Sequence, residues 1–312
     1  MPTLLDYRRR IRSVRSTQQI TKTMKMVAAA RLRRAQERVF SARPYAQEIL
    51  AVLRSLVSRI PALPAGGEEA VHPLLARRPE EKILVLVLTG DRGLCGAFNA
   101  NVLRRAVEFL KEKEKRSPEI VAIGKKGRDY FRSHRRKMAE EYVNVFARLD
   151  YAQASQVAGR VIALYAEAKV DAVYAIYNEF KSILAQKLTT EKLLPIEEIP
   201  SARQEWVAGR ARAEVRPETK PAPAENPVDY IYEQPAQELF NELVPRHLTT
   251  QIFRILLESA AAEHAARMTA MDAATSNAAE LIDRITLEMN RARQATITRE
   301  IIEIVSGAAA LR

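Results

Sequence analysis

The segment Gly90–Gly96 has the composition of a loop that binds phosphate. It reads GDRGLCG, follows the apolar run Ile83–Thr89 and precedes a helical stretch that starts near Phe98. Backbone N–H groups at such a strand–helix turn can hold an anion at the helix N-terminus. However, the glycines are spaced G-x-x-G-x-x-G, which is neither the dinucleotide-binding pattern nor a P-loop. We therefore favour a tight structural turn here, with nucleotide binding as the alternative.

Residues that bind metals or act as nucleophiles are sparse. The chain has one cysteine, Cys95, and four histidines that stand singly at positions 72, 134, 247 and 264. One cysteine excludes an intrachain disulfide and favours a reducing compartment. Single histidines do not give the ligand spacing of a metal site. We expect no catalytic residue, metal or cofactor in this chain, and we expect Cys95 to pack as a small apolar side chain.

Positive charge is concentrated at the start of the chain. The 312 residues carry 50 Lys+Arg and 38 Asp+Glu, a formal net charge of +12. Residues 1–60 alone hold 14 Lys+Arg and 3 Asp+Glu, a net charge of +11. Three interpretations are open: a solvated helix face, a nucleic-acid footprint, or attraction to an acidic protein partner. No aromatic residue lies between Tyr7 and Phe40, so base stacking has no support there.

Glycine and proline divide the chain into two helical ends and a compact middle. Residues 1–65 contain no glycine, and residues 246–312 contain no proline. Each end also repeats apolar or small residues in a 4-3 alternation, which is the seam of a left-handed coiled coil. The seam residues are Ala28, Leu32, Ala35, Val39, Ala42, Ala46, Ile49, Leu53, Leu56 and Ile60, then Leu257, Ala261, His264, Met268, Met271, Thr275, Ala278, Ile282, Ile285, Met289 and Ala292. We predict that segments 1–60 and 246–312 pair as an antiparallel coiled coil.

The middle segment, 61–245, alternates strand and helix patterns. The expected strands are Ile83–Thr89, Ile120–Ile123, Val170–Tyr177 and Ser182–Thr189, and the expected helices are Phe98–Lys115, Lys126–Ser133 and Ala152–Ala168. An unbroken apolar run is typical of a strand that is buried on both faces. The predicted fold class is therefore α/β with long helices, in which the coiled coil is joined to a Rossmann-like domain. Residues 195–235 hold seven of the fifteen prolines, which predicts an extended linker or insertion.

The extreme C-terminus is apolar around most of its circumference. The residues concerned are Ile297, Ile301, Ile302, Ile304, Val305 and 308–311. A helix that is apolar all round should be buried, and one antiparallel partner helix cannot cover it all. We therefore predict that another chain provides an apolar sleeve, with Ile301 and Val305 among the contacts. The longest apolar run, Ile83–Leu88, is too short to cross a bilayer, so we expect no direct bilayer insertion.

Three regions resemble one known family closely. They read IRSVRSTQQITKTMKMVAAARLRRAQ (11–36), LTGDRGLCGAFNANV (88–102), and ARMTAMDAATSNAAELI (266–282) followed by NRARQATITREIIEIVSGAAAL (290–311). In these motifs the sequence resembles the gamma-subunit family of F-type ATP synthases. The proline-rich stretch around 197–227 departs from the family pattern, so no family property is carried over to it.

The resemblance implies a non-catalytic central rotor shaft. The terminal helices would turn inside a catalytic hexamer of alpha and beta subunits. The α/β domain would rest on the membrane-embedded c-ring, beside the epsilon subunit, at the cytoplasmic face of the bacterial cell membrane. Rotation driven by protons would then be coupled to ATP synthesis or hydrolysis. Two other classes remain as alternatives: a nucleic-acid-binding coiled coil, and a nucleotide-binding α/β enzyme with helical arms.

The resemblance also implies partner-binding residues. Met24 is similar to a shaft methionine near the mobile lever of a beta subunit, with packing inside the helix pair as the alternative. Arg293 and Gln294 resemble a polar pair that engages a beta-subunit loop. The acidic lever of the beta subunit would meet basic residues of the first helix, namely Lys22, Lys25, Arg31, Arg33 and Arg34. Tyr230 and Glu233 resemble residues near the c-ring.

Overall fold

The computed structural model describes residues 3–59, 72–76, 78–147, 149–196 and 233–310. The chain falls into two compact units. One unit combines residues 1–30 with 267–312, and the other is formed by residues 31–266. Two long helices, α1 (Leu4–Arg59) and α6 (Ala236–Ala310), contribute a segment to each unit.

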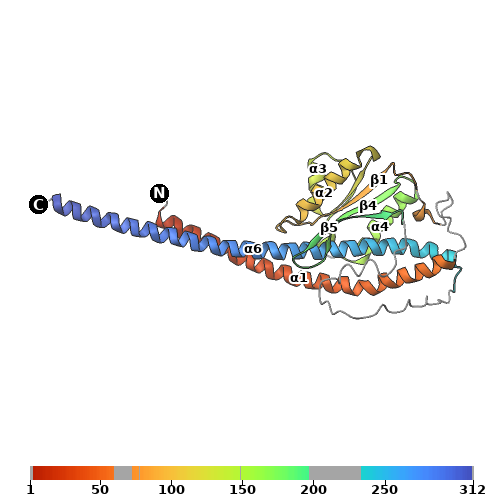
Figure 1. Ribbon diagram of the computed structural model, residues 1–312, viewed down its shortest axis with the longest axis horizontal. Helices are drawn as coiled ribbons and strands as arrows, with labels where there is room; N and C mark the ends of the chain where they lie inside the picture. Colours follow the sequence, from red (N-terminus) through yellow and green to blue (C-terminus); the bar gives the residue numbers. More distant parts are fainter. Residues whose placement is uncertain (1–2, 60–71, 77, 148, 197–232, 311–312) are drawn as a thin grey trace, which may run out of the picture. The chain divides into compact units, whose positions relative to one another are not determined.

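A five-stranded sheet lies in the unit 31–266 (Figure 1). Its strands are β1 (Ile83–Leu88), β2 (Glu119–Ile123), β3 (Met138–Tyr142), β4 (Ala172–Phe180) and β5 (Gln186–Leu194). They follow the order β3-β2-β1-β4-β5, in which the first four are parallel and β5 is antiparallel to β4. The connection from β3 to β4 crosses over β2 and β1, so the strand order reverses between β1 and β4, as in doubly wound folds. The predicted α/β fold class is therefore confirmed.

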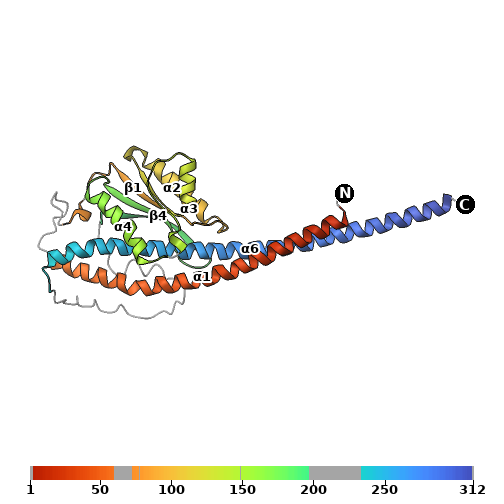
Figure 2. The ribbon, with the colours of Figure 1, turned by 180° about the vertical axis from the view of Figure 1, so that it is seen from behind.

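Helices cover both faces of the sheet (Figures 1 and 2). Helices α2 (Phe98–Glu112) and α3 (Lys125–Ser133) pack on one face, where they meet the odd-numbered residues of β1. Helix α4 (Tyr151–Ala166) and segments of α1 and α6 pack on the other face, against the even-numbered residues. All six residues of β1 are buried, because its unbroken ILVLVL sequence supplies an apolar side chain to each face in turn.

The structure differs from the expected strands at β3, β4 and β5, and β4 runs from Ala172 to Phe180 instead of from Val170 to Tyr177. β5 begins at Gln186 rather than at Ser182, because Ser182 N–H donates to the carbonyl oxygen of Ala185 at 2.9 Å and closes a turn. The sequence pattern does not predict β3 at all. Its residues, MAEEY, are half-buried or exposed, as suits a strand at the edge of a sheet, so they show no apolar run. Parallel pairing with β2, rather than side-chain burial, holds this strand in place.

Helix α6 begins at Ala236, before the boundary expected at 246. Pro245 lies inside the helix, although proline normally disfavours helix interiors. The neighbouring residues Phe240, Val244 and Leu248 are buried in a core that also contains Leu53 and Leu56 of α1. Tertiary packing of an apolar face contributes most of the stability of protein helices, so it outweighs the local cost of the proline.

The two long helices run antiparallel within the unit formed by 1–30 and 267–312. The hydroxyl oxygens of Thr21 and Thr275 lie 2.8 Å apart. Four residues later on α1, Lys25 Nζ lies 2.5 Å from Asp272 Oδ1 on α6. Residue numbers therefore rise along one helix as they fall along the other, which confirms the antiparallel pairing in this unit.

The predicted seams are turned away from solvent. Every seam residue that the structure describes is buried or half-buried, and Leu32 and Ala261 retain only 3% and 0% of their exposed area. The polar members His264 and Thr275 are half-buried as well. Alanine removes little apolar area from water, so many of these layers contribute less than a leucine layer would.

His247 of α6 is buried, and its protonation is coupled to folding. The side chain is 5% exposed, and burial, followed by the positive charge of Arg254, lowers the pKa of His247 from 6.5 to about 4. As the pH falls, the imidazole of His247 is protonated near pH 6.5 in the unfolded chain but only near pH 4 in the folded chain. The contribution of neutral His247 to stability is therefore complete above about pH 6.5 and is lost as the pH falls toward 4.

We expect replacement of His247 by Leu to remove this pH dependence. Between about pH 7.5 and pH 5, the wild-type free energy of unfolding should fall by about 2 kcal/mol more than that of the variant. Urea unfolding of both purified proteins at the two pH values measures the difference. Parallel stability curves for the two proteins would contradict the assignment.

Candidate partner-binding site

The glycine-rich turn after β1 receives a side chain from α6. A Cβ placed on Gly90 would lie 2.8 Å from the Cδ atom of Glu263, so the glycine makes room for that carboxylate. Glu263 is itself buried, at 4% exposure. The Gly90 N–H donates to Asn99 Oδ1 at 2.8 Å. In doubly wound folds this crevice at the carboxyl ends of the strands receives the ligand, and here an internal carboxylate lies in it.

The N-terminus of α3, on the other side of the turn, is also satisfied internally. Asp91 Oδ1 accepts hydrogen bonds from the backbone N–H groups of Lys125 and Asn144, each at 2.9 Å. Thr89 Oγ1 accepts a third hydrogen bond from Gly127 N–H at 2.8 Å. A carboxylate thus holds the position at the helix N-terminus where a phosphate would bind. The arrangement favours the structural interpretation of the turn.

Cys95 packs in this region. It is 2% exposed, and its sulfur accepts a hydrogen bond from Asn99 Nδ2 at 3.1 Å. Phe98 and two alanines of α6, Ala262 and Ala266, surround it. Within the described ranges, no three His, Cys, Asp or Glu side chains gather in a way that could hold a metal ion.

The basic residues expected to meet an acidic partner lie on α1. Lys22, Arg31 and Arg34 are exposed. Arg33 is exposed too, and its Nε lies 3.2 Å from Glu37 Oε1 one turn further along. Lys25 differs, because its ion pair with Asp272 ties α1 to α6 within the unit 1–30 and 267–312. The exposed cations fit both a solvated helix face and an acidic partner.

Met24 lies beside a shallow hollow on α1. The hollow is also lined by Ser16, Gln19, Ile20 and Thr23. Met24 is half-buried, whereas Ile20 and the nearby Met26 are each 58% exposed. Half-burial is compatible with packing in the helix pair and with contact to a partner, so both interpretations of Met24 remain.

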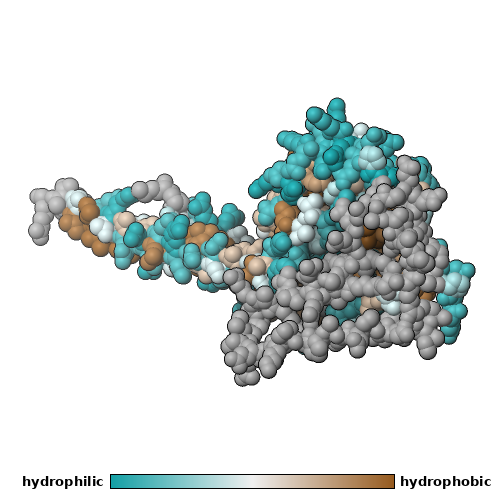
Figure 3. Space-filling model, turned by 45° about the vertical axis from the view of Figure 1, so that its right-hand side comes forward, coloured by the Kyte–Doolittle hydropathy of each residue, from teal (hydrophilic) through white to brown (hydrophobic). Residues whose placement is uncertain are grey.

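The last turns of α6 carry exposed apolar side chains, which we call the apolar tip. Its members and their exposed fractions are Ile297 (48%), Ile301 (55%), Ile302 (58%), Ile304 (72%) and Val305 (62%). Figure 3 shows hydrophobic residues on the surface of this helical region. Arg293 and Gln294 precede the tip and are exposed as well. Contiguous exposed apolar residues mark interaction sites.

The exposed apolar surface of the unit formed by 1–30 and 267–312 extends beyond the apolar tip that the sequence predicted. Leu281 and Leu287 of α6 are 40% and 61% exposed, and Val27 of α1 is 47% exposed. A signal for them was present in the sequence, because all three fall between seam positions of the 4-3 repeat and so cannot face the paired helix. Of the two residues expected near a c-ring, Glu233 is exposed just before α6, and Tyr230 lies outside the described residues.

Comparison with known proteins covers almost the whole chain. A family model described as ATP synthase matches residues 3–311. The ATP synthase gamma chain of Solibacter usitatus is 49% identical over 311 residues, which span 99% of both chains. That of Pelotomaculum thermopropionicum is 46% identical over the full length of both. The chain belongs to the ATP synthase gamma-chain family. The resemblance in the three sequence regions is thereby confirmed.

Solved structures share the fold of this gamma-chain family member. One match is a chain of the central stalk and c-ring structure of the Tetrahymena thermophila mitochondrial ATP synthase, with a TM-score of 0.56 and 23% identity, covering 82% of this chain and 99% of that one. Another is a chain of the Euglena gracilis mitochondrial ATP synthase (OSCP/F1/c-ring, rotational state 3), with a TM-score of 0.63, 20% identity and coverage of 99% and 94%. None of the helices that the structure describes is long and apolar enough to cross a membrane.

Proposed function

We propose that this chain is the central rotor shaft of an F-type ATP synthase, coupling proton-driven rotation of a c-ring to ATP synthesis or hydrolysis. The observation that carries the proposal is the apolar tip, a set of apolar side chains that are 48–72% exposed at the end of α6. Such a surface needs a protein collar, since a helix with apolar residues on most sides is otherwise buried. A ring of alpha and beta subunits would supply that collar.

The shaft itself performs no catalysis in this proposal. The turn that follows β1, where an α/β enzyme would bind a nucleotide, receives the carboxylate of Glu263 and directs Asp91 to the N-terminus of α3. Nucleotide chemistry would therefore belong to the alpha and beta subunits. The shaft would act on these subunits through its shape. The side chains exposed on α1 are not the same as those exposed on α6, so the surface of the helix pair would be asymmetric.

The partner-binding residues are assigned as follows. Met24 and the exposed basic residues of α1 would meet the acidic lever of a beta subunit, with Lys22, Arg31, Arg33 and Arg34 more available than Lys25, which already pairs with Asp272. Arg293 and Gln294 would engage a beta-subunit loop, and Ile301 and Val305 would lie in the apolar collar. Long-range attraction between the basic helix and an acidic lever supports this assignment.

The unit that contains the sheet would form the foot of the shaft. In this proposal it rests on the c-ring beside the epsilon subunit, with Tyr230 and Glu233 near the c-ring. The chain would then be a peripheral protein at the cytoplasmic face of the bacterial cell membrane, held there by its partners.

Co-purification tests the proposal. The chain, tagged and expressed with the alpha and beta subunits, should elute with a nucleotide-hydrolysing hexamer. Ile301→Asp combined with Val305→Asp should weaken recovery of the hexamer, and Thr296→Asp combined with Thr298→Asp, two exposed polar positions on the preceding turn of α6, serves as the control. Elution of the chain without a hexamer would contradict the proposal.

Graded truncation of α6 should weaken assembly in two steps. Deletion of 297–312 removes the whole apolar tip, whereas deletion of 308–312 leaves all five of its described residues in place. Because apolar contact area drives association, we expect the longer deletion to lose more hexamer. Native gel or size-exclusion analysis of the two complexes gives the comparison, and equal losses would speak against an apolar collar.

Single removal of an exposed arginine should leave torque largely intact. Arg31, Arg33 and Arg34 are exposed, and exposed ion pairs contribute roughly 0–1 kcal/mol each. A shaft that pushes by shape therefore tolerates Arg→Ala at any one of these positions. Single-molecule rotation under viscous load measures the torque, and stalling of any one variant would refute a steric mechanism.

A further inference from the structure

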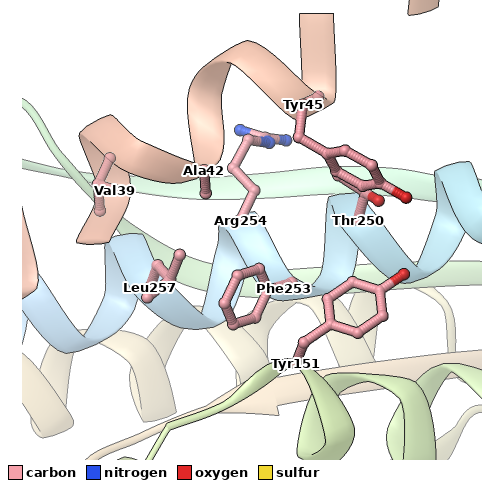
Figure 4. Close-up of a pocket in the computed structure, with 9 residues that line it drawn as sticks. Val39, Ala42, Tyr45, Tyr151, Thr250, Phe253, Arg254 and Leu257 are labelled. Carbon is pink, nitrogen blue, oxygen red and sulfur yellow. The ribbon is translucent and has the colours of Figure 1, made fainter. Parts of the chain in front are cut away.

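Three helices of the unit 31–266 enclose a small pocket (Figure 4). Its volume is about 110 Å³. α1 contributes Val39, Ala42, Tyr45 and Ala46, α4 contributes Tyr151, and α6 contributes Thr250, Phe253, Arg254 and Leu257. None of these residues belongs to the apolar tip, and the rotor proposal gives them no role.

The pocket exists because small residues occupy the seam at this level. Ala42 and Ala46 of α1 face the space bounded by Phe253 and Leu257 of α6, and two alanine side chains cannot fill it. Carbon atoms line most of the wall, so the cavity has little to offer a strongly hydrated molecule. An apolar cavity of ~150 Å³ in another protein binds benzene, which shows that a space of this kind accepts a single aromatic ring.

Two tyrosines give the pocket a polar end. Tyr45 is 50% exposed and Tyr151 is 41% exposed, so both mark the side that is open to solvent. Figure 4 shows their rings one above the other beside Thr250, with both hydroxyl groups turned to the same end of the pocket. The ring of Tyr151 also packs edge-on against Phe253, with ring centroids 5.6 Å apart. A phenolic hydroxyl both donates and accepts, so this end can bind one polar substituent of a ligand.

The arginine in the wall does not make the pocket an anion site. Arg254 Nη2 lies 2.7 Å from Glu191 Oε1, and Nη1 lies 3.4 Å from Glu258 Oε1. Both terminal nitrogens of the guanidinium are therefore already engaged by carboxylates of the chain. A carboxylate ligand would have to compete with Glu191 and Glu258 for this cation.

We propose that this pocket binds a small, neutral, one-ring aromatic molecule with a single polar substituent, of which phenol is the simplest example. The ring would occupy the apolar space between α1 and α6, and its substituent would hydrogen-bond to Tyr45 and Tyr151 at the open end. Binding would add contacts among α1, α4 and α6 and so stabilise the folded chain, with a stabilisation that rises as the logarithm of ligand concentration above the Kd.

Thermal unfolding of the full-length chain tests the proposal with three probes: phenol, benzene and benzoate. Phenol should raise the unfolding midpoint most, benzene less, and benzoate not at all. Ala42→Leu should fill the pocket and abolish the phenol shift, whereas Ala273→Leu, at an exposed site on α6, should keep it. A shift that persists unchanged in Ala42→Leu, or a larger shift with benzoate than with phenol, would overturn the assignment.

Removal of the Tyr151 hydroxyl group gives a second test that does not depend on the folding of Ala42→Leu. Tyr151→Phe should weaken phenol binding by roughly two- to tenfold, the effect of one lost hydrogen bond, while leaving benzene binding unchanged. Tyr130→Phe, which alters a tyrosine outside the pocket, is the control. Equal phenol affinity in wild type and Tyr151→Phe, or equal weakening in Tyr130→Phe, would contradict the role given to the tyrosines.

Discussion

Gly124→Ala is expected to destabilise the chain by more than about 4 kcal/mol, enough to prevent stable folding. Gly124 follows β2 and has φ = +96°, a backbone conformation that residues with a Cβ rarely adopt. A Cβ at this position would lie 1.9 Å from the carbonyl oxygen of Thr89. A shift of the backbone at Gly124 would relieve this clash only at the cost of a hydrogen bond, because Gly124 N–H also donates to the carbonyl oxygen of Tyr142 at 2.7 Å. The substitution would separate β1 from the start of α3.

Gly159→Ala provides the matched control within the same unit. Gly159 lies inside α4, and a Cβ there would meet nothing within 4 Å. Since alanine favours helix over glycine by roughly 1 kcal/mol, this variant should be slightly more stable than wild type. Yields of soluble protein and urea unfolding report both effects. A Gly124→Ala protein as stable as wild type would contradict the geometry of the β1–β2–α3 junction.

Arg254→Met is expected to destabilise the chain by about 3 kcal/mol, because it leaves two half-buried carboxylates without their cation. Arg254 of α6 reaches the sheet by its ion pair with Glu191 on β5, and it also faces Glu258 one turn along its own helix. Its side chain is 19% exposed, so solvent screens these pairs poorly. Tyr177 O–H donates to the other Glu191 oxygen at 2.7 Å. This cluster is a polar connection between α6 and the antiparallel edge of the sheet.

The stability that Arg254→Met loses relative to wild type should depend on pH in a defined direction. Burial raises the pKa of Glu258, and the positive charge of Arg254 opposes that rise. Without Arg254 the pKa rises further, so the folded variant binds a proton that the unfolded chain releases. The contribution of the Glu258 carboxyl to the stability of the variant is then greatest at low pH and is lost as the pH rises through its folded-state pKa. The deficit of Arg254→Met against wild type should therefore be larger at pH 8 than near pH 4.5, the ordinary pKa of the Glu258 carboxyl.

Arg246→Met serves as the control for Arg254→Met. Arg246 lies on the same helix and pairs with Glu242 at 2.5 Å, but both side chains are more than half exposed. An exposed pair within one helix contributes less than about 1 kcal/mol. Denaturant unfolding of both variants compares the two sites. Similar losses in the two variants would show that the buried cluster has no special contribution.

Sequence periodicity predicted the helix pair well, because a single physical requirement sets it. Residues every 3.5 positions must face the partner helix. The seam positions from Ala28 to Leu56 on α1 and from Leu257 to Ala292 on α6 follow that rule in the structure. β1 was predictable for a similar reason, since a strand buried on both faces needs an unbroken apolar run. In contrast, β3 depends on backbone pairing at an edge, which MAEEY does not encode locally.

Contacts between distant segments were not predictable from one sequence. Glu263 and Gly90, like Arg254 and Glu191, meet only because the fold brings α6 against the sheet. The start of α6 at Ala236 has the same origin, since the core contacts of Phe240 and Val244 override the signal of Pro245. The roles of Met24, Arg293 and Gln294 depend on subunits that lie outside this chain, and they stay predictions.

Single-molecule rotation tests the central claim, that this chain turns within a ring of catalytic subunits, most directly. Lys111→Cys places a reactive thiol on an exposed position of α2, and the one native cysteine, Cys95, is buried and should not compete for the label. With the ring fixed to a surface and a bead on this thiol, added ATP should drive continuous rotation in one direction. A complex that assembles and hydrolyses ATP while its bead only fluctuates at random would contradict the account.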